Sequence, residues 1–412
     1  MNVLEVVEPG VDGVFRHVEG LVQFLASRAI RVSLAYSDVR GSEGLRQLVR
    51  EVEGQGGKTL NLQVGNKPSP QDLLAAVKLR RLIHDVQPDI VHAHSSKAGG
   101  LLRLPFVAAR SKPVFYTPHA YYGMARRVGA GPWVFDRVES MLARRGTTIN
   151  ISPDEAAFAR ARLGVPTSRQ RVIHNPVRTD RFRPPSAEER RAARQTFGVP
   201  DGAVAVGTVG RMCFQKDPET LYRALAPLLK RRPELVLMHL GEGELMGELK
   251  RLSGSLGIDR QVRFAGYAEN PLSFYHALDA LAMTSRYEAG WPIVILEALA
   301  LGLPVVSSRA PGTADIDKAG LSHCWTAEAG DVAGFELALT ALLDDLPRGR
   351  PSNHREVALA RFSPEACFGA VLGEYREALG QPRPSDPPVQ QVPLRRGALD
   401  GAAAGGRDLE LD

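Results

Sequence analysis

Strand-like and helix-like segments alternate along most of this 412-residue chain. The strand-like segments are short apolar runs, and the segments between them carry apolar residues spaced three and four apart, as on one face of a helix. Regular alternation of this kind favours an α/β fold, in which helices cover parallel sheets. The strands expected in the first half are residues 3–7, 30–36, 89–93, 114–117, 147–151 and 172–177. Those expected in the second half are residues 203–208, 235–240, 262–265, 280–283 and 304–307.

The length of the chain allows two domains of ordinary size. The boundary is expected near residues 178–185, ahead of a helix that opens with the capping-box sequence Ser186-Ala-Glu-Glu189. Residues 381–412 are rich in Pro, Gly and charged residues and contain few large apolar ones. This tail is therefore expected to be disordered.

Composition narrows the class of protein. Hydrophobic residues make up 44% of the chain and charged residues 24%, as is typical of a soluble globular protein. The three cysteines are odd in number and far apart, which indicates free thiols in a reducing compartment. The N-terminal segment has no signal-peptide pattern, and the longest apolar run, residues 292–306, is too short to span a bilayer. A cytoplasmic protein is expected.

The formal net charge of +6 favours an acidic partner. A general preference for arginine, spread over solvated faces, explains the same charge equally well. The sequence has no zinc-finger spacing, no RNA-binding aromatic signature and no long basic helix, so a nucleic-acid partner is not expected.

Two cations lie on one loop of the second half. Arg211 and Lys216 follow the expected strand 203–208 and precede a helix that opens at Asp217-Pro218. Arginine offers a planar fork that binds phosphate through two bonds, and lysine offers a mobile point charge. The pair is suited to a diphosphate.

Two carboxylates follow further along the chain. Glu288 precedes a glycine-containing loop, and Glu297 lies inside the apolar helix that comes next, so both can face one cleft. Carboxylates bind sugar hydroxyls well. Combined with the two cations, they indicate a nucleotide-sugar site.

These two segments resemble the retaining glycosyltransferases of family four, which have the GT-B fold. That family carries a G-R-x-x-x-Q-K-G-like loop and, later, an E-x7-E motif followed by A-x-x-x-G-x-P-V-V. The matching positions are Gly210, Arg211, Gln215, Lys216 and residues 297–306.

The chain departs from the family pattern at two places. Asp217 stands where the family usually has Gly, and Glu288 and Glu297 are separated by eight residues instead of seven. Either Ala289 or Gly290 is an insertion that is looped out, or the first acid has moved.

The resemblance implies two Rossmann-like domains that face a cleft. Residues 1–178 would form the acceptor-side domain, and residues 179–363 the domain that binds the nucleotide sugar. Residues 364–380 would form a helix that crosses back to the first domain.

The resemblance also implies roles for individual residues. Arg211 and Lys216 would neutralise the leaving diphosphate in place of a metal ion, and Glu297 would bind the ribose hydroxyls. The donor-binding residues implied are Gly13, Arg211, Lys216, Gly266, Gly290 and Glu297. No cofactor is expected, and the donor would be a UDP- or GDP-sugar.

His119 and Glu288 are the residues that the resemblance places beside the transferred sugar. The alternative for His119 is a core histidine with a backbone partner. His94 and Lys97 would line the acceptor side, with Lys97 near an anionic group of a glycan or a lipid-linked acceptor.

A metal site is not expected. The sequence His92-Ala-His94 resembles a metal-binding pair, but no third ligand lies at a clear spacing. Asp315-Ile-Asp317 resembles the metal-binding DxD of another glycosyltransferase fold, yet its context is similar to the G-G-x-x-E loop of family four. His17 is expected only as a helix residue at an interface.

One segment combines apolar and basic residues. It contains Trp133, Phe135, Val138, Met141 and Leu142 together with Arg126, Arg127, Arg137, Arg144 and Arg145. Such a segment is suited to an anionic membrane surface, so the protein could be peripheral on the inner face of the cell membrane. A domain helix buried on one side is the alternative.

The expected function is metal-independent, retaining transfer of a sugar from a nucleoside-diphosphate sugar to a glycan or lipid-linked acceptor, in the synthesis of a cell-surface polysaccharide or glycolipid. A nucleotide-sugar 2-epimerase of the same fold is one alternative. A non-catalytic scaffold derived from a transferase is another, since Asp217 and the spacing of Glu288 depart from the family.

Overall fold

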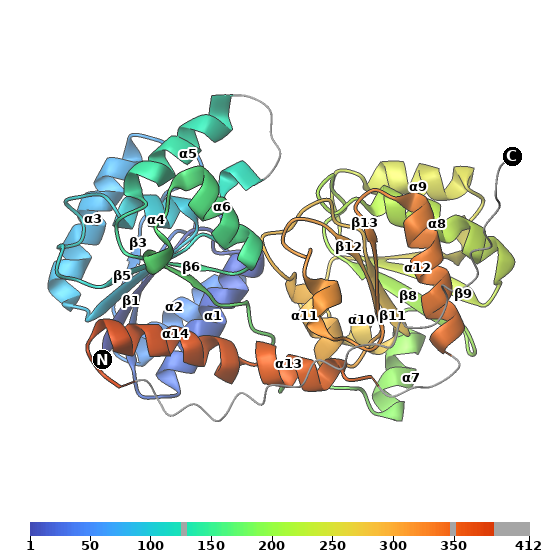
Figure 1. The fold of residues 1–412 in the computed structure, drawn as a ribbon. Helices are drawn as coiled ribbons and strands as arrows, with labels where there is room; N and C mark the ends of the chain where they lie inside the picture. The colour runs from blue at the N-terminus through green and yellow to red at the C-terminus, as the bar shows by residue number, and fades with distance from the viewer. Residues whose placement is uncertain (125–129, 347–351, 383–412) are drawn as a thin grey trace, which may run out of the picture.

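The computed structural model describes residues 1–124, 130–346 and 352–382. It contains two α/β domains that lie side by side (Figure 1). Each domain is built on a parallel sheet with helices on both faces, which confirms the fold class expected from the alternating pattern.

The sheet of the first domain has seven parallel strands in the order β3-β2-β1-β4-β5-β6-β7. The strands are β1 (Asn2–Val7), β2 (Arg31–Tyr36), β3 (Thr59–Asn61), β4 (Ile90–His94), β5 (Val114–Thr117), β6 (Thr147–Asn150) and β7 (Gln170–Val172). The central strands β1 and β4 are buried almost throughout, as strands of a doubly covered parallel sheet should be.

Helices cover both faces of this first sheet. One face packs on α1, α2 and α14, and the other on α3 and α4, with α5 and α6 toward the β6 side. These helices are α1 (Asp12–Ala26), α2 (Glu43–Gly54), α3 (Gln71–Val86), α4 (Ser96–Leu102), α5 (Ala130–Leu142), α6 (Pro153–Leu163) and α14 (Pro364–Ala378).

The sheet of the second domain has six parallel strands in the order β10-β9-β8-β11-β12-β13. The strands are β8 (Val204–Val209), β9 (Leu235–Leu240), β10 (Val262–Gly266), β11 (Ala280–Met283), β12 (Val305–Arg309) and β13 (Cys324–Glu328). The helices are α7 (Ala187–Thr196), α8 (Pro218–Arg231), α9 (Met246–Ser255), α10 (Leu272–His276), α11 (Ile293–Ala300), α12 (Val332–Asp345) and α13 (His354–Phe362).

The chain crosses between the domains twice, and the two crossings touch. The backbone N–H of Val177 donates to the carbonyl of Phe362 at 2.7 Å. Val177 and Phe182 belong to the core of the second domain, so that core begins at or before Val177. On the return crossing, α13 packs against α11 and α14 packs against α1 (Figure 1).

The strand expected at residues 172–177 is wrong. The final strand of the first sheet is β7 (Gln170–Val172), and residues 173–177 form the connection to the second domain. Pro176 has no N–H to donate to a sheet, which is one reason why this apolar run does not extend the strand. Two edge strands, β3 and β13, were not expected from the sequence.

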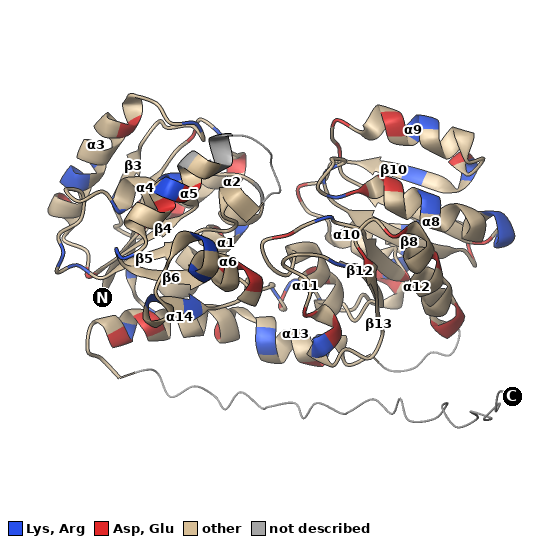
Figure 2. Ribbon diagram, turned by 45° about the horizontal axis from the view of Figure 1, so that its top comes forward, with Lys and Arg blue, Asp and Glu red and all other residues tan. Residues whose placement is uncertain are grey.

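Charged residues of both signs lie on the outer helices of both domains. In Figure 2, Lys and Arg alternate with Asp and Glu along helices such as α8 and α9. None of the helices in the described part of the chain has the length and apolar character that a membrane span requires. The three cysteines are free thiols.

Candidate functional site

The loops that carry the two motifs leave the carboxyl ends of neighbouring strands. The Arg211–Lys216 loop follows β8, the Glu288 loop follows β11, and these two strands pair directly. Open α/β sheets bind ligands at the carboxyl ends of their strands. The topology therefore brings together segments that lie far apart in the sequence.

Lys216 and Glu288 form an ion pair. Lys216 Nζ lies 2.5 Å from Glu288 Oε1, and the two side chains are only 22% and 10% exposed. Gln215 Nε2 donates to the carbonyl of Tyr287 at 3.1 Å and lies 3.5 Å from Glu288 Oε2. The end of the first motif and the first acid of the second thus lie in one place.

Arg211 is arranged differently. It follows Gly210 at the end of β8, and its side chain is exposed, without an ion pair to any other residue that the structure describes. Its guanidinium is thus accessible to an anionic ligand, and the Lys216 side chain passes 3.7 Å from where a Cβ on the preceding Gly210 would lie.

The surroundings of Asp217 show how this position accommodates an aspartate where the family usually has glycine. Its backbone has a left-handed conformation (φ 45°), which glycine adopts without strain. Its carboxylate accepts from Arg286 Nη2 at 2.9 Å and from Thr220 Oγ1 at 2.8 Å. The negative charge of Asp217 is therefore neutralised by Arg286.

The extra residue between the two acids lies in a loop that contacts the first domain. Ser152 Oγ donates to the carbonyl of Ala289 at 2.6 Å. A Cβ on Gly290 would lie 2.9 Å from the carbonyl oxygen of Ile151, so glycine allows this close approach. The loop leaves Glu288 beside Lys216 and Glu297 inside α11.

The loop that contains Pro311 and Gly312 packs against the backbone of Glu288. Glu288 N–H donates to the carbonyl of Pro311 at 2.7 Å, and a Cβ on Gly312 would lie 2.2 Å from the Glu288 carbonyl oxygen. The N–H of Gly312 donates to Asp154 Oδ2 of the first domain at 2.7 Å.

Glu297 is buried and holds two partners. Tyr275 donates its hydroxyl to Glu297 Oε2 at 2.7 Å, and Arg16 Nη1 lies 3.3 Å from Oε1. Burial raises the pKa of Glu297 to about 7, and the charge of Arg16 and the Tyr275 hydrogen bond oppose this rise. Because Arg16 lies on α1, this contact joins the two domains.

Gly13 and Gly266 occupy opposite sides of the domain boundary. Gly13 is exposed in the first turn of α1, where a Cβ would lie 3.6 Å from Ile293 Cδ1 of the second domain. Gly266 ends β10 in a left-handed conformation (φ 70°), and its carbonyl accepts from Gly241 N–H at 2.7 Å. The structure does not bring Gly13 and Gly266 into contact.

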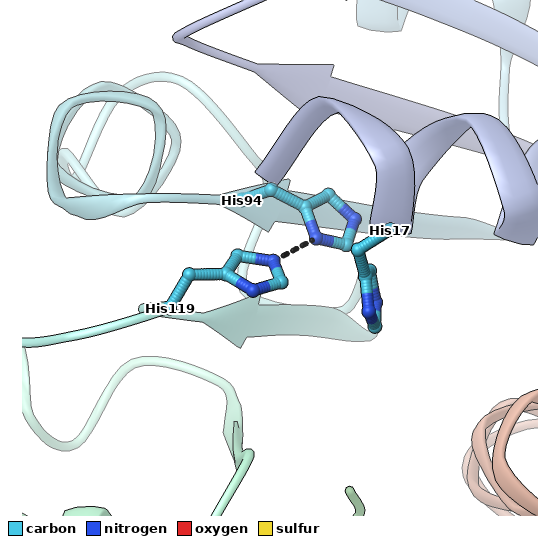
Figure 3. A group of neighbouring side chains, drawn as sticks. All are labelled: His17, His94 and His119. Atoms are coloured by element: carbon cyan, nitrogen blue, oxygen red, sulfur yellow. Dashed lines mark hydrogen bonds between the residues drawn. The ribbon is translucent and has the colours of Figure 1, made fainter. Parts of the chain in front are cut away.

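His119 and His94 lie together at the carboxyl ends of β5 and β4 (Figure 3). His119 Nε2 lies 3.1 Å from His94 Nδ1, and His94 Nε2 lies 2.8 Å from Glu5 Oε2. His119 (φ 54°) and Ala120 (φ 107°) both have left-handed backbones, and such residues are frequent at functional sites.

Burial sets the protonation of this histidine group. Burial lowers the pKa of His94 to about 3, and it lowers the pKa of His119 well below its usual value. Burial raises the pKa of Glu5 to about 8, opposed by a hydrogen bond from Tyr375. The imidazoles are therefore neutral near pH 7.

Lys97 does not lie free on the acceptor side. Its Nζ is 2.7 Å from Asp72 Oδ2 and 2.7 Å from the carbonyl of Lys67, and its side chain is only 9% exposed. Its charge is compensated within the first domain. Asp315, rejected as a metal ligand on sequence grounds, accepts from Trp291 Nε1 at 2.8 Å.

Two neighbours of the site, Arg16 and Tyr275, were not identified from the sequence, and a third, His17, was expected only as a helix residue at an interface. All three lie on α1 or α10, outside the motifs. Arg16 and Tyr275 contact Glu297, and His17 lies beside His94 and His119, so they reach the site only through tertiary packing. The segment Phe15-Arg16-His17-Val18, two residues after Gly13, was the available signal for Arg16 and His17.

A cavity of about 600 Å³ lies between the domains. Its lining combines residues of the first domain with residues after β12 and β13: Gly123, Met124, Asp154, Phe158, Arg309, Ala310, Pro311, Ala314 and Glu328. None of the expected site residues lines it. It borders the site through Pro311, whose carbonyl binds the Glu288 N–H.

Known proteins resemble both halves of the chain. Residues 11–181 match the family described as Glycosyltransferase Family 4, and residues 203–345 match the family described as Glycosyl transferases group 1. The chain is 31% identical over 313 residues to D-inositol 3-phosphate glycosyltransferase 2 of Catenulispora acidiphila, covering 71% of each protein. It is 26% identical over 279 residues to UDP-Gal:alpha-D-GlcNAc-diphosphoundecaprenol alpha-1,3-galactosyltransferase of Escherichia coli, covering 67% of this chain and 71% of that protein.

Solved structures show the same fold. Anabaena HepE in complex with UDP superposes with a TM-score of 0.75 at 21% identity, covering 92% of this chain and 100% of that one. The family matches to both halves, the 31% identity to a named glycosyltransferase and the two-domain GT-B fold show that this chain belongs to the family 4 glycosyltransferases, the glycosyl transferases of group 1.

Proposed function

We propose that this protein transfers a sugar from a nucleoside-diphosphate sugar to an acceptor, with retention of anomeric configuration and without a metal ion at the diphosphate. The observation that carries the proposal is the contact of Lys216 with Glu288, on the loop that also carries the accessible Arg211. Cations for a diphosphate and a carboxylate for a sugar lie at the carboxyl ends of two neighbouring strands. Lys216 and Glu288 neutralise each other's charge when no donor is bound.

The chemistry follows from these positions. When the bond between the sugar and the diphosphate breaks, negative charge develops on the leaving diphosphate, and Arg211 and Lys216 stabilise it. Lys216 exchanges Glu288 for phosphate, which frees Glu288 to bind sugar hydroxyls. Glu297 binds the ribose, and His119 binds the sugar from the first domain.

The acceptor is proposed to carry phosphate. The names of the two relatives specify an inositol phosphate and a diphosphoundecaprenol acceptor, which share this group. On α5, Trp133, Val138 and Met141 are 63%, 46% and 74% exposed, and Arg137 is exposed beside them. This surface supports contact with an anionic membrane, and therefore a lipid-linked acceptor at the inner face. Arg126 and Arg127 lie outside the described residues.

The test is an incubation of the protein with UDP- and GDP-hexoses, with and without a polyprenyl-diphosphate sugar, followed by NMR of the products. The expected result is acceptor-dependent release of nucleoside diphosphate, a product with the donor's anomeric configuration, and turnover that EDTA does not lower. An epimer formed from the donor alone would instead identify a 2-epimerase. Failure of every donor to bind at about millimolar concentration would indicate a non-catalytic protein.

A further inference from the structure

Three histidines from three different elements meet in the first domain (Figure 3). His17 comes from α1, His94 ends β4, and His119 follows β5. One ring nitrogen of each lies within 4.8 Å of one ring nitrogen of the other two. The absence of a third ligand, which argued against a metal in the sequence, does not apply to this arrangement.

The remaining ring nitrogens of two of these histidines are held by outer partners. His94 Nε2 lies 2.8 Å from the carboxylate of Glu5, and His17 Nδ1 lies 3.0 Å from Asn175 Oδ1. Histidines that bind metals usually donate their second N–H to a carboxylate or carbonyl oxygen, which orients the ring. These two contacts occupy one nitrogen of each ring, so the other nitrogen, His94 Nδ1 or His17 Nε2, is available to bind an ion.

His17 Nε2 has no hydrogen-bond partner among the described residues, although His17 is only 6% exposed. A buried polar atom without a partner is unfavourable and calls for a ligand or a water. On the other side, His94 Nδ1 and His119 Nε2 lie 3.1 Å apart, a separation that adjacent ligands of one ion can adopt.

We propose that His17, His94 and His119 form a three-histidine site for a divalent transition-metal ion of the Zn²⁺ class. The ligand atoms are His17 Nε2, His94 Nδ1 and His119 Nε2, and a fourth position is left for water. Imidazole nitrogen suits Zn²⁺, and three protein ligands with one open position form a familiar zinc arrangement. His119 is the least buried member, so an ion enters past it.

A second group, Glu5, His92 and His94, is a poorer site. His92 already uses both nitrogens, with Tyr375 at 2.5 Å and Thr117 at 2.8 Å, and all three residues are fully buried. An ion there would have to break these contacts and would have no route from solvent.

The ion would act on the sugar side of the cleft and not on the diphosphate. The cations for the diphosphate lie in the second domain, whereas the three histidines lie in the first. Since the ion would engage the nitrogen of His119, Zn²⁺ is expected to inhibit transfer, and EDTA to restore it. This consequence rests on the proposed function, but binding of the ion does not.

The test is a titration of the purified chain with Zn²⁺ alone by calorimetry, and with Co²⁺ by visible absorption. The variants are His17→Ala and His119→Ala, with His84→Ala as the control, since His84 is an exposed histidine on α3 whose side chain is 84% accessible. The expected result is one ion per chain and the intense absorption of four-coordinate Co²⁺ bound by nitrogen. Each of the two site variants should weaken binding by about tenfold or more, and the control should not.

Asn175→Ala provides a second route to the answer if a ligand variant fails to fold. It leaves all three ligands in place and is expected to weaken Zn²⁺ binding by about tenfold, because His17 loses its orienting partner. The proposal is overturned if the wild-type chain binds no Zn²⁺ at about 100 μM. It is equally overturned if binding is lost in His84→Ala or unchanged in His17→Ala and His119→Ala. Inhibition of transfer without these binding results would also contradict it.

Discussion

Lys216 and Glu288 neutralise each other in the donor-free protein, so each must change partner when a donor binds. Both are largely buried, and removal of one leaves the other without its counter-charge. Arg211 does not have to give up a partner when a donor binds, because it is exposed and has no ion pair within the described residues. The two cations are therefore expected to differ in their effect on stability while sharing an effect on catalysis.

Lys216→Ala and Arg211→Ala are each expected to lower turnover by about tenfold or more, since each removes a charge-assisted contact of about 1.5–3 kcal/mol to the diphosphate. Only Lys216→Ala should lower the melting temperature without donor, because Glu288 loses its partner. Steady-state kinetics and thermal denaturation measure the two effects. Near-normal transfer in either variant would contradict the diphosphate assignment.

Glu297 makes donor binding depend on pH. Burial raises its pKa to about 7, and Arg16, Tyr275 and Arg181 oppose this rise. Because of this raised pKa, Glu297 is partly protonated near pH 7. The ribose hydroxyls bind best to the ionised carboxylate, so protonation of Glu297 weakens donor binding. Donor affinity is therefore expected to increase as pH rises from about 6 to 8.

Calorimetry across this pH range measures the effect, with Glu297→Gln as the control. The Gln variant should bind more weakly and show no rise. Arg16→Ala should move the rise to higher pH, because Arg16 favours the ionised carboxylate. A wild-type affinity that falls as pH rises would contradict the role of Glu297.

The site could be predicted from the sequence only where its residues belong to motifs. Lys216 and Glu288 could be assigned to one site in advance because they belong to the two motifs, although their ion pair was not predicted. Arg16 and His17 could not, because their roles depend on how α1 docks against the second domain and against β4 and β5. No local pattern encodes such docking.

The loop that carries Glu288 is shaped by a second loop beneath it. Gly312 has a left-handed backbone (φ 89°) and lies so close to Glu288 that a Cβ would be 2.2 Å from its carbonyl oxygen. Gly330 has a similar backbone (φ 81°) but nothing within 4 Å of a Cβ. Alanine at either position would have the same backbone strain, but only alanine at Gly312 would also clash with the Glu288 loop. Comparing the two substitutions therefore separates the two effects.

Gly312→Ala is expected to cost about 2–4 kcal/mol of unfolding free energy and to weaken donor binding, because the Glu288 loop must shift. Gly330→Ala should cost only about 1 kcal/mol and leave donor binding unchanged. Chemical denaturation and donor titration of both variants decide the matter. Equal donor affinity in the two variants would show that Gly312 does not position Glu288.

Most strands could be predicted because buried parallel strands are continuous apolar runs. β3 and β13 were missed for the opposite reason. They are edge strands, and β3 is only three residues long, while β13 carries Thr326 and Glu328 among its five residues. The strand predicted at residues 172–177 was wrong because most of this run forms the connection between the domains. Its last residue, Val177, packs in the core of the second domain.

The two domains are joined by specific contacts around the site. Arg16 meets Glu297, Ser152 meets Ala289, and Asp154 meets Gly312, so the loops that hold the donor groups also touch the first domain. A change at these contacts should therefore affect both stability and transfer.

Ser152→Ala tests this coupling. Ser152 caps α6 by accepting from Glu155 N–H at 3.0 Å, and it also donates to Ala289 across the boundary. Ser363 is a buried control that caps α14 by accepting from Ala366 N–H at 3.2 Å. Ser363→Ala is expected to cost about 1 kcal/mol, and Ser152→Ala about 1 kcal/mol more, with reduced transfer. Equal losses and equal activities would show that the Ala289 contact contributes nothing.

The most direct test of the diphosphate site is a calorimetric comparison of nucleoside diphosphate with nucleoside monophosphate, using the base that this protein accepts. Wild-type protein is predicted to bind the diphosphate about 100-fold more tightly than the monophosphate, and the Arg211→Ala/Lys216→Ala double variant to reduce that ratio below about tenfold. A ratio in the double variant equal to that of the wild type would contradict this prediction, because it would mean that Arg211 and Lys216 do not bind the diphosphate.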